Sequence, residues 1–279
     1  MNDLAETHRS FVNTWECDEN DHLNVQFYMK RFDEAARFHR LLADGEPIAA
    51  LPAARHIRYH AELRAGDATV VRSGLVSDSA NGSHVVHLLE CPDTGRLHAT
   101  AVDTHDGRSV LSGGLTEFPD AARPRSLADG PEKPDGRAAI LAAGGLVSHR
   151  RIADPGDCDA GGGLLARHYI GAASDAAPHV WGHAGFASNW LIENGYGRVA
   201  VEMKATFLSP ARAGDPIEMV SKSSFVGRTI RLHHEMFRIG ADEPLARVDV
   251  VGLIVDLRTR RAITADQLQR LGREAAGGN

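Results

Sequence analysis

The sequence predicts an α+β protein in which one long helix, wrapped by an antiparallel sheet, occurs twice along the chain. Residues 17–36 and 158–177 share a Cys-Asp pair, a tyrosine and a closing Ala-Ala pair at matching places. The segment Arg-Ala-Gly-Asp then follows in each copy, at 64–67 and again at 212–215. Two ordered matches at nearly one spacing indicate an internal duplication, so both copies are expected to have the same order of elements.

A strand is expected over residues 8–16, followed by a turn and an amphipathic helix of about five turns. The apolar residues of this helix recur at the i, i+3, i+4, i+7 spacing of a single face. That face consists of Val25, Tyr28, Met29, Phe32, Ala35, Ala36, His39 and Leu42. Because Tyr28 belongs to this stripe, it is interpreted as a core residue, with substrate binding as the alternative.

Alternating apolar and polar residues predict the strands of the first copy. Over residues 56–63, apolar Ile57 and Leu63 alternate with His56 and Arg58, which predicts a strand buried on one face only. Further strands are expected near 68–78, 83–91 and 96–106, with Asn81-Gly82 as a hairpin turn. The second copy repeats this order with a strand near 145–152, a helix near 165–178 and strands near 198–208, 216–226, 229–239 and 245–256.

Residues 119–137 are rich in proline, glycine and charge, a composition typical of a linker. We therefore predict a first domain over residues 1–118 and a second domain over residues 138–279. The second domain is expected to end in a short helix that begins at Thr264, with Gln267 as its capping-box partner.

The composition narrows the classes of protein. A formal net charge of −6 disfavours a nucleic-acid binder and a basic membrane-surface protein. The three cysteines form no CxxC pair, which favours a reducing compartment. The first residues are polar and acidic rather than signal-like, and no apolar run approaches the roughly 20 residues of a spanning helix. A cytoplasmic protein with no membrane association is expected.

The turn between the first strand and the first helix carries a motif. From Cys17 to Tyr28 it reads Cys-Asp-x-x-x-His-Leu-Asn-x-x-x-Tyr. This pattern resembles the signature of 4-hydroxybenzoyl-CoA thioesterase-like proteins, which have the hot-dog fold. The resemblance covers residues 8–118 and 143–258, and Asp21 stands where the family often has a glycine. It implies two tandem hot-dog folds packed as a pseudo-dimer, because single-copy relatives form their site between two subunits.

The resemblance also implies hydrolysis of an acyl thioester of coenzyme A or of acyl carrier protein. In that case Asp18 either activates water or attacks the carbonyl itself. His22 would orient the water or the carboxylate, or protonate the leaving thiolate. Asn24 would hold the turn or supply a donor, and the amides from about Asn24 to Phe27 would polarise the carbonyl. The alternative for Asp18 and Asn24 is a purely structural role as turn and cap residues.

The motif is incomplete in the second copy. Asp159 matches Asp18, but Gly163 stands in the place of His22 and Leu165 in the place of Asn24. Asp159 is therefore either the acid of a second site or a turn residue without a catalytic role.

No cofactor and no metal are expected. P-loop, Rossmann and GxSxG motifs do not occur, and no Cys/His set has zinc spacing. His56 and His60 lie too far apart along one strand to bind a metal together, so the strand histidines are expected to be solvated. Arg72, Lys222 and Arg228 are basic residues that could meet phosphates of coenzyme A, although nothing in the sequence singles one of them out.

Two other functions stay open: a hot-dog enoyl-thioester hydratase or dehydratase, and a non-catalytic acyl-thioester-binding protein. The sequence does not indicate which acyl group the protein prefers. Association into a homo-oligomer also stays open.

Overall fold

The computed structural model describes residues 4–45, 51–78, 82–105, 115, 117–264, 266–267 and 270. The chain divides into two compact units. Unit 1 comprises residues 1–132, 165–171 and 204–208, and unit 2 comprises residues 133–164, 172–203 and 209–279. The first division, after Glu132, falls inside the predicted linker. Among the described residues, no helix combines the length and the apolar character needed to cross a membrane.

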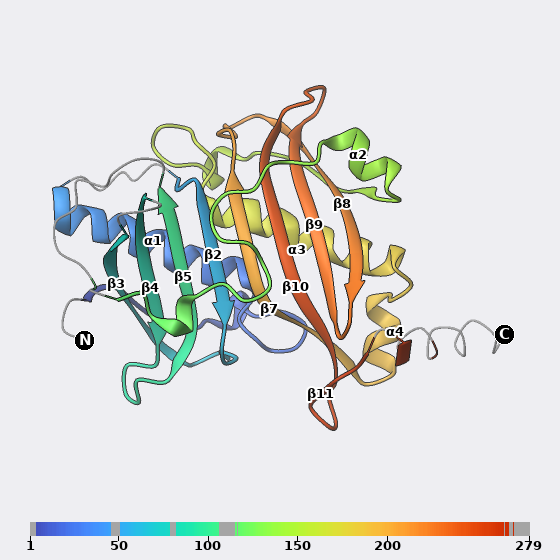
Figure 1. The fold of residues 1–279 in the computed structure, drawn as a ribbon, viewed down its shortest axis with the longest axis horizontal. Coiled ribbons are helices and arrows are strands. Elements are labelled where there is room, and N and C mark those ends of the chain that lie inside the picture. Colours follow the sequence, from blue (N-terminus) through green and yellow to red (C-terminus); the bar gives the residue numbers. More distant parts are fainter. Residues whose placement is uncertain are drawn as a thin grey trace. The chain divides into compact units, whose positions relative to one another are not determined.

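Unit 1 is an antiparallel sheet with one long helix against it (Figure 1). Its strands are β1 (Ala5–Phe11), β2 (Ala54–Tyr59), β3 (Ala68–Asp78), β4 (Gly82–Glu90) and β5 (Leu97–His105). They pair in the order β1-β3-β4-β5-β2. The helix α1 (Val25–Asp44) packs against β1, β3 and β4, and two 3-10 turns, η1 (Thr14–Glu16) and η2 (Asp120–Ala122), complete the unit.

The predicted amphipathic helix is confirmed as α1. Its inward stripe is buried at Tyr28, Met29, Phe32 and Ala35. The helix ends at Gly45, whose φ of 74° allows its N–H to donate to the Leu41 carbonyl, the usual role of glycine after a helix. The first strand is shorter than predicted, because β1 ends at Phe11 and the chain then forms η1.

The prediction of a strand buried on one face only is wrong for β2. His56 is 4% exposed and Arg58 is 6% exposed, so the supposed solvent face is also covered. The cover is the first part of the predicted linker, since Nη1 of Arg58 donates to the carbonyls of Asp120 and Ala121 at 3.3 and 2.7 Å. Ala122 belongs to the same outer core with Val76, Val86 and Val102. A segment that reads as a linker therefore closes the outer face of the sheet.

Unit 2 has the same plan (Figure 1). Its strands are β6 (Leu146–Ile152), β7 (Tyr196–Phe207, of which 196–203 lie in this unit), β8 (Pro216–Val226), β9 (Thr229–Arg238), β10 (Pro244–Asp256) and β11 (Arg261–Ala262). They pair in the order β7-β10-β9-β8-β6, and β11 pairs with β10. The helices are α2 (Arg137–Ala142), α3 (Ala166–His183, of which 172–183 lie in this unit) and α4 (Ser188–Glu193), with the 3-10 turn η3 (Pro155–Asp157).

The predicted strands of the second copy are confirmed, and the predicted helix is longer, because α3 continues past Pro178. The short helices α2 and α4 are too brief to show a hydrophobic period. Ile140 of α2 packs with Val220 and Phe237, so this helix covers the outer face of the second sheet. The capping box predicted at Thr264 is present, since Thr264 N–H donates to Gln267 Oε1 and Gln267 N–H donates to Thr264 Oγ1. The hairpin residue Asn81 lies outside the described residues.

The Arg-Ala-Gly-Asp segments form one and the same turn in both copies. The N–H of Arg64 donates to Oδ2 of Asp67 at 2.8 Å, and the N–H of Arg212 donates to Oδ2 of Asp215 at the same distance. The glycines between them have φ angles of 93° and 86°, which only glycine adopts without strain. The repeated segment therefore forms the same turn in each copy, before β3 in unit 1 and before β8 in unit 2.

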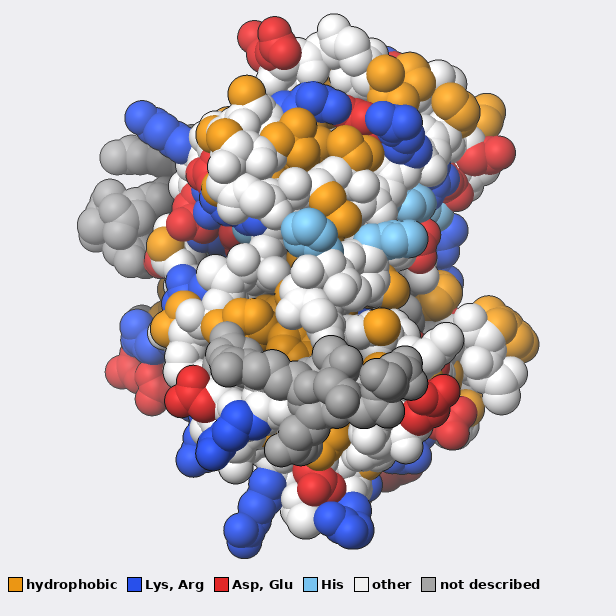
Figure 2. Space-filling view, turned by 90° about the vertical axis from the view of Figure 1, so that its right-hand side faces the viewer, with side chains coloured by type: hydrophobic (Ala, Val, Ile, Leu, Met, Phe, Trp, Pro, Cys, Tyr) orange, Lys and Arg blue, Asp and Glu red, His pale blue; other side chains and the backbone are white. Residues whose placement is uncertain are grey.

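The expectation that the strand histidines are solvated is wrong for most of them. His56, His84, His87, His98, His233 and His234 are all buried. His87 and His234 find hydroxyl partners inside each sheet, with Nδ1 lying 2.6 Å from Oγ of Ser73 and of Ser221 respectively. Other histidine side chains do reach the surface, as Figure 2 shows on one face of the molecule.

Candidate active site

The turn that leads into α1 is closed by backbone hydrogen bonds. The N–H of Asp18 donates to the carbonyl of His22 at 2.8 Å, and the N–H of Leu23 donates to the carbonyl of Leu63 at 2.8 Å. Asp21 takes a φ of 58°, the left-handed region that aspartate tolerates better than most residues. The aspartate thus forms the turn that the family often builds with glycine.

The carboxylate of Asp18 is held by this turn through one oxygen. Its Oδ1 accepts hydrogen bonds from the N–H groups of Asn20 and His22 at 2.8 and 3.2 Å. Within the described part of the chain, Oδ2 has no hydrogen-bond partner. Burial raises the pKa of Asp18, and the two amide hydrogen bonds only partly offset this effect. The result is a fixed carboxylate with one available oxygen and a raised affinity for a proton.

Asn24 is the N-cap of α1. Its Oδ1 accepts from the N–H of Gln26 at 3.0 Å, its carbonyl accepts from the N–H of Phe27 at 2.9 Å, and its own N–H donates to Glu16. Three of the four amides predicted to polarise a carbonyl are therefore already engaged, and the prediction is wrong for them. The N–H of Val25 is the one that has no partner among the described residues, and it lies at the positive end of the helix dipole.

His22 is held by two side chains that the sequence does not single out. Its Nε2 lies 2.9 Å from Nη2 of Arg64 and 3.2 Å from Oε2 of Glu62. Arg64 was visible only as part of a repeated segment, and Glu62 only as a polar residue of an alternating stretch. Both come from the loop that follows β2, and the turn brings His22 to them.

Tyr28 is confirmed as a core residue. It is 4% exposed, and its ring meets the ring of Tyr59 edge to face at a centroid distance of 5.1 Å. Burial raises the pKa of Tyr28, so the phenol stays neutral. Its role in substrate binding stays a prediction.

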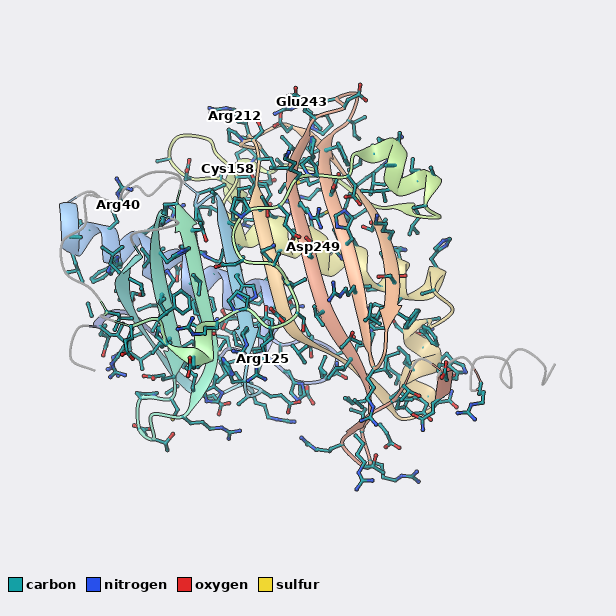
Figure 3. The ribbon with its side chains drawn as sticks, viewed as in Figure 1. Arg40, Arg125, Cys158, Arg212, Glu243 and Asp249 are labelled. Carbon is teal, nitrogen blue, oxygen red and sulfur yellow. The ribbon has the colours of Figure 1, made fainter. Side chains whose placement is uncertain are left out.

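The matching turn in unit 2 keeps the acid but loses its neighbours. Oδ1 of Asp159 accepts from the N–H groups of Gly161 and Gly163 at 2.8 and 3.0 Å, just as Asp18 does in unit 1. Gly163 offers no imidazole, and Leu165 offers no capping oxygen to α3. Arg212, which lies near this turn in Figure 3, donates instead to the carbonyl of Gly161 at 3.4 Å.

One group of side chains in unit 2 has the composition of a metal site. Ligand atoms of Asp135, His233 and Glu235 lie within 4.8 Å of one another. These atoms already have partners, however. Nε2 of His233 lies 3.2 Å from Glu235, and Oδ2 of Asp135 lies 2.6 Å from Nζ of Lys222. The group is therefore part of an ion-pair network, which the sequence could not reveal because its members come from distant segments.

Asp249 and Arg247 extend this network. Nδ1 of His233 lies 2.8 Å from Oδ1 of Asp249, which also accepts from Arg247. Burial alone would lower the pKa of His233, but its hydrogen bonds to Asp249 and Glu235 outweigh burial and raise it. A protonated His233, Lys222 and Arg247 thus balance three carboxylates.

A long helix against an antiparallel sheet, in each of the two units, defines the hot-dog class of folds. The model of the thioesterase-like superfamily matches residues 12–125 and 153–270, and the chain belongs to this family. None of the curated proteins searched matches the chain by sequence.

Solved structures share the fold over nearly the whole chain. The 12:0-ACP thioesterase from Umbellularia californica has a TM-score of 0.59 at 11% identity, covering 88% of this chain and 93% of that one. An acyl-ACP thioesterase from Bacteroides thetaiotaomicron has a TM-score of 0.60 at 14% identity, covering 90% and 98%. At such low identity the likeness shows the shared hot-dog fold, so the site rests on this chain's own residues.

Proposed function

We propose that this protein hydrolyses acyl thioesters of coenzyme A or of acyl carrier protein at the turn of unit 1. The observation that carries the proposal is the carboxylate of Asp18, which is fixed through Oδ1, available through Oδ2 and made more basic by burial. A base with a raised pKa accepts a proton from water more readily at neutral pH.

In the first route, Oδ2 of Asp18 accepts a proton as the water oxygen bonds to the carbonyl carbon. The electron pair of the C=O bond moves to oxygen, where the N–H of Val25 and the helix dipole stabilise the negative charge. When the C=O bond re-forms, the C–S bond breaks and the thiolate leaves with its electron pair. A thiolate leaves readily, so strong acid assistance is not required.

In the second route, Oδ2 of Asp18 attacks the carbonyl itself and expels the thiolate. The mixed anhydride that results is then hydrolysed by water, which regenerates the carboxylate. Both routes need the same free oxygen and the same oxyanion donor. The geometry therefore supports Asp18 as the catalytic residue in either case.

His22 is proposed to deliver a proton to the thiolate or to orient the water. Glu62 and Arg64 support this role, because both lie within hydrogen-bond distance of Nε2 of His22. Asn24 is proposed to act through the helix it caps, since its amide oxygen fixes the first turn beside Val25.

Asp159 is proposed to be a turn residue without a catalytic role. Its turn lacks the imidazole and the cap that accompany Asp18. We retain the domain limits of residues 1–118 and 138–279 and a cytoplasmic location as proposals. Acyl carrier protein is retained beside coenzyme A because two proteins with this fold are named as acyl-ACP thioesterases.

The test is the release of free thiol from a panel of short, long and aromatic acyl-CoA and acyl carrier protein thioesters. Wild type is compared with Asp18→Asn and with Asp159→Asn, the same change in the matching turn. We expect Asp18→Asn to lose about a hundredfold or more of kcat, and Asp159→Asn to stay near wild type. Equal losses in both variants, or no thiol release from any substrate, would count against the proposal.

A further inference from the structure

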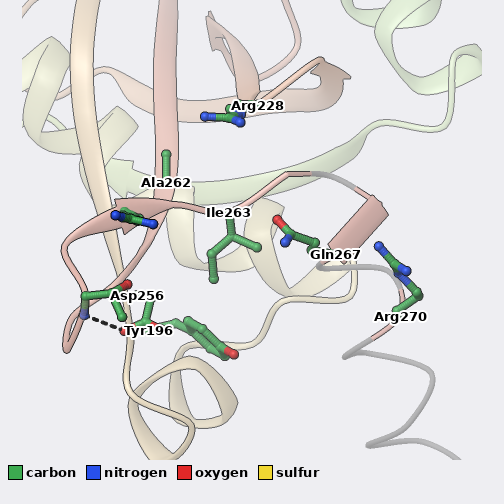
Figure 4. A pocket seen from close by; sticks show the side chains of 9 residues that line it. Tyr196, Arg228, Asp256, Ala262, Ile263, Gln267 and Arg270 are labelled. Atoms are coloured by element: carbon green, nitrogen blue, oxygen red, sulfur yellow. Dashed lines mark hydrogen bonds between the residues drawn. The ribbon is translucent and has the colours of Figure 1, made fainter.

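Unit 2 contains a cavity that the thioester site does not use (Figure 4). It lies among the first residue of β7, the β8–β9 turn, the turn after β10 and the segment that follows β11. Its volume is about 980 Å³, at the upper end of the range of small-molecule and cofactor sites. A single inorganic phosphate would fill only a small part of it.

The charge of the cavity is opposite to that of the chain. Arg228, Arg261 and Arg270 line it, against a single carboxylate from Asp256, while the whole protein carries a net charge of −6. Figure 4 shows Arg228 and Arg270 reaching toward the cavity from different parts of the chain. A local excess of guanidinium groups in an acidic protein indicates a site for an anion.

Arg270 donates through Nε to the carbonyl of Asp266 at 3.3 Å, whereas Arg228 and Arg261 differ from many arginines of the described chain in lacking a side-chain partner. Arg9 pairs with Glu6 at 2.7 Å and Arg238 with Asp215 at 2.8 Å. By contrast, the side chains of Arg228 and Arg261 make no ion pair or hydrogen bond with any residue that the structure describes.

The one acid of the cavity is already engaged. Oδ1 of Asp256 accepts from the N–H groups of Arg258 and Thr259 at 2.9 Å each, and these bonds hold the pKa of Asp256 below its usual value. Asp256 therefore fixes the turn after β10, and the guanidinium groups of Arg228 and Arg261 are available to a ligand.

The remaining lining suits a flat organic group. The ring of Tyr196 borders the cavity and stacks on Trp190, with centroids 5.9 Å apart and an interplanar angle of 24°. Ile263 adds an apolar surface beside it. Guanidinium groups bind phosphates through paired hydrogen bonds, and aromatic rings stack on nucleobases.

We propose that this cavity binds a phosphate ester of nucleotide type, with Arg228 and Arg261 on its phosphates and its base on the side of Tyr196 and Ile263. The cavity is lined by none of the residues of the Asp18 turn, so the proposal stands whether or not thioester hydrolysis is confirmed. Of the basic residues named from the sequence, Arg72 pairs with Glu90 and Lys222 with Asp135, which leaves Arg228 as the one free for this purpose among the three.

The test is isothermal titration calorimetry of the full chain with three probes: 3′,5′-ADP, 5′-ADP and pyrophosphate. The variants are Arg228→Ala, Arg261→Ala and, as a control, Arg9→Ala, which removes the same charge at a residue of unit 1 that does not line the cavity. Because Arg228 and Arg261 are exposed, their replacement is expected to leave the thermal unfolding midpoint unchanged.

We expect at least one nucleotide to bind more tightly than pyrophosphate, and each cavity variant to weaken that binding about tenfold while Arg9→Ala does not. Tighter binding of 3′,5′-ADP would identify the nucleotide end of coenzyme A as the source, and tighter binding of 5′-ADP a free nucleotide. Either supports the proposal. Absence of binding by both nucleotides, pyrophosphate binding as tightly as they do, or an equal loss in Arg9→Ala would overturn it.

Discussion

Nη2 of Arg64 lies 2.9 Å from Nε2 of His22. A guanidinium group only donates hydrogen bonds, so this contact requires that Nε2 carries no proton. Oε2 of Glu62, 3.2 Å from the same nitrogen, can accept only when Nε2 is protonated. Arg64 and Glu62 thus offer one partner to Nε2 of His22 without its proton and one to Nε2 with it.

Replacing Arg64 tests this arrangement. We expect Arg64→Ala to lower kcat about tenfold, the effect of losing one hydrogen bond from a charged group to an active-site side chain. The matched control is Arg212→Ala, which removes the equivalent arginine from unit 2, where no histidine is present at the turn. Thiol-release kinetics at saturating substrate measure the difference, and equal losses would assign Arg64 a structural role only.

The raised pKa of Asp18 has a consequence for stability. Burial disfavours the charged carboxylate, so the folded state holds this proton more tightly than the unfolded state. Burial of the charged carboxylate therefore destabilises the folded state above the folded pKa of Asp18. This destabilisation disappears as the pH falls below the unfolded pKa of about 3.9. We expect Asp18→Asn to be at least as stable as wild type at pH 7 while losing activity. Urea unfolding at pH 7 checks this, and a marked destabilisation would mean that the carboxylate serves the fold.

The ion-pair network around His233 also predicts a pH dependence of stability, and for His233 it has the same sign as for Asp18. The pKa of His233 is raised in the folded state. The stabilisation that protonated His233 gives to the fold is therefore complete below its unfolded pKa of about 6.5, and it is lost as the pH rises through the folded pKa. Hydrogen bonds from His233 and Arg247 outweigh burial and lower the pKa of Asp249 to about 2. The stabilisation by ionised Asp249 is complete above its unfolded pKa of about 3.9, and it is lost as the pH falls toward its folded pKa. The network is strongest between these limits.

The change that tests the network is His233→Gln. Thermal unfolding should show a midpoint lower by about 2–4 °C near pH 5.5, and a difference that shrinks at pH 9. His179→Gln, at an exposed histidine of α3, serves as the control. If the midpoints of wild type and His233→Gln differed by the same amount at pH 5.5 and pH 9, the result would contradict a stabilising role for protonated His233.

The contact between Arg58 and the predicted linker also predicts a stability change. Arg58→Ala removes the donor to carbonyls of Asp120 and Ala121 beneath the cover of the sheet. We expect a loss of about 1.5–3 kcal/mol in the free energy of unfolding. Arg72→Ala, at a partly exposed ion pair with Glu90, should cost less than about 1 kcal/mol. Equal losses of unfolding free energy in Arg58→Ala and Arg72→Ala would mean that the segment with Asp120 and Ala121 adds no stability by covering the sheet.

The sequence predicts those features that depend on residues close together in the chain, and it does not predict those that depend on distant segments. The helix α1, the strands and the Asp18 turn are set by periodicity and by neighbours along the chain, and these predictions hold. The second buried face of β2 depends on η2, some 60 residues later, whose composition reads as a linker. Buried His87 and His234 depend on hydroxyl groups of neighbouring strands, which no spacing within one strand reveals.

The site shows the same division. Asp18, His22 and Asn24 could be named because the turn brings them together within seven residues. Glu62 and Arg64 could not, because they meet His22 only after β2 returns to the turn. The amides of Gln26 and Phe27 are engaged because Asn24 caps the helix, the role that the sequence offered for Asn24 as the alternative.

The most direct test of the central claim is to incubate the protein with crotonyl-CoA and follow two products at once, free thiol and the hydrated 3-hydroxyacyl thioester. We predict that thiol and free acid appear in equal amounts without hydration, that Asp18→Asn abolishes both, and that Asp159→Asn retains both. Hydration without thiol release would contradict hydrolysis and favour a hydratase. Thermal stabilisation by crotonyl-CoA with neither product, unchanged in Asp18→Asn, would contradict it in favour of a binding protein.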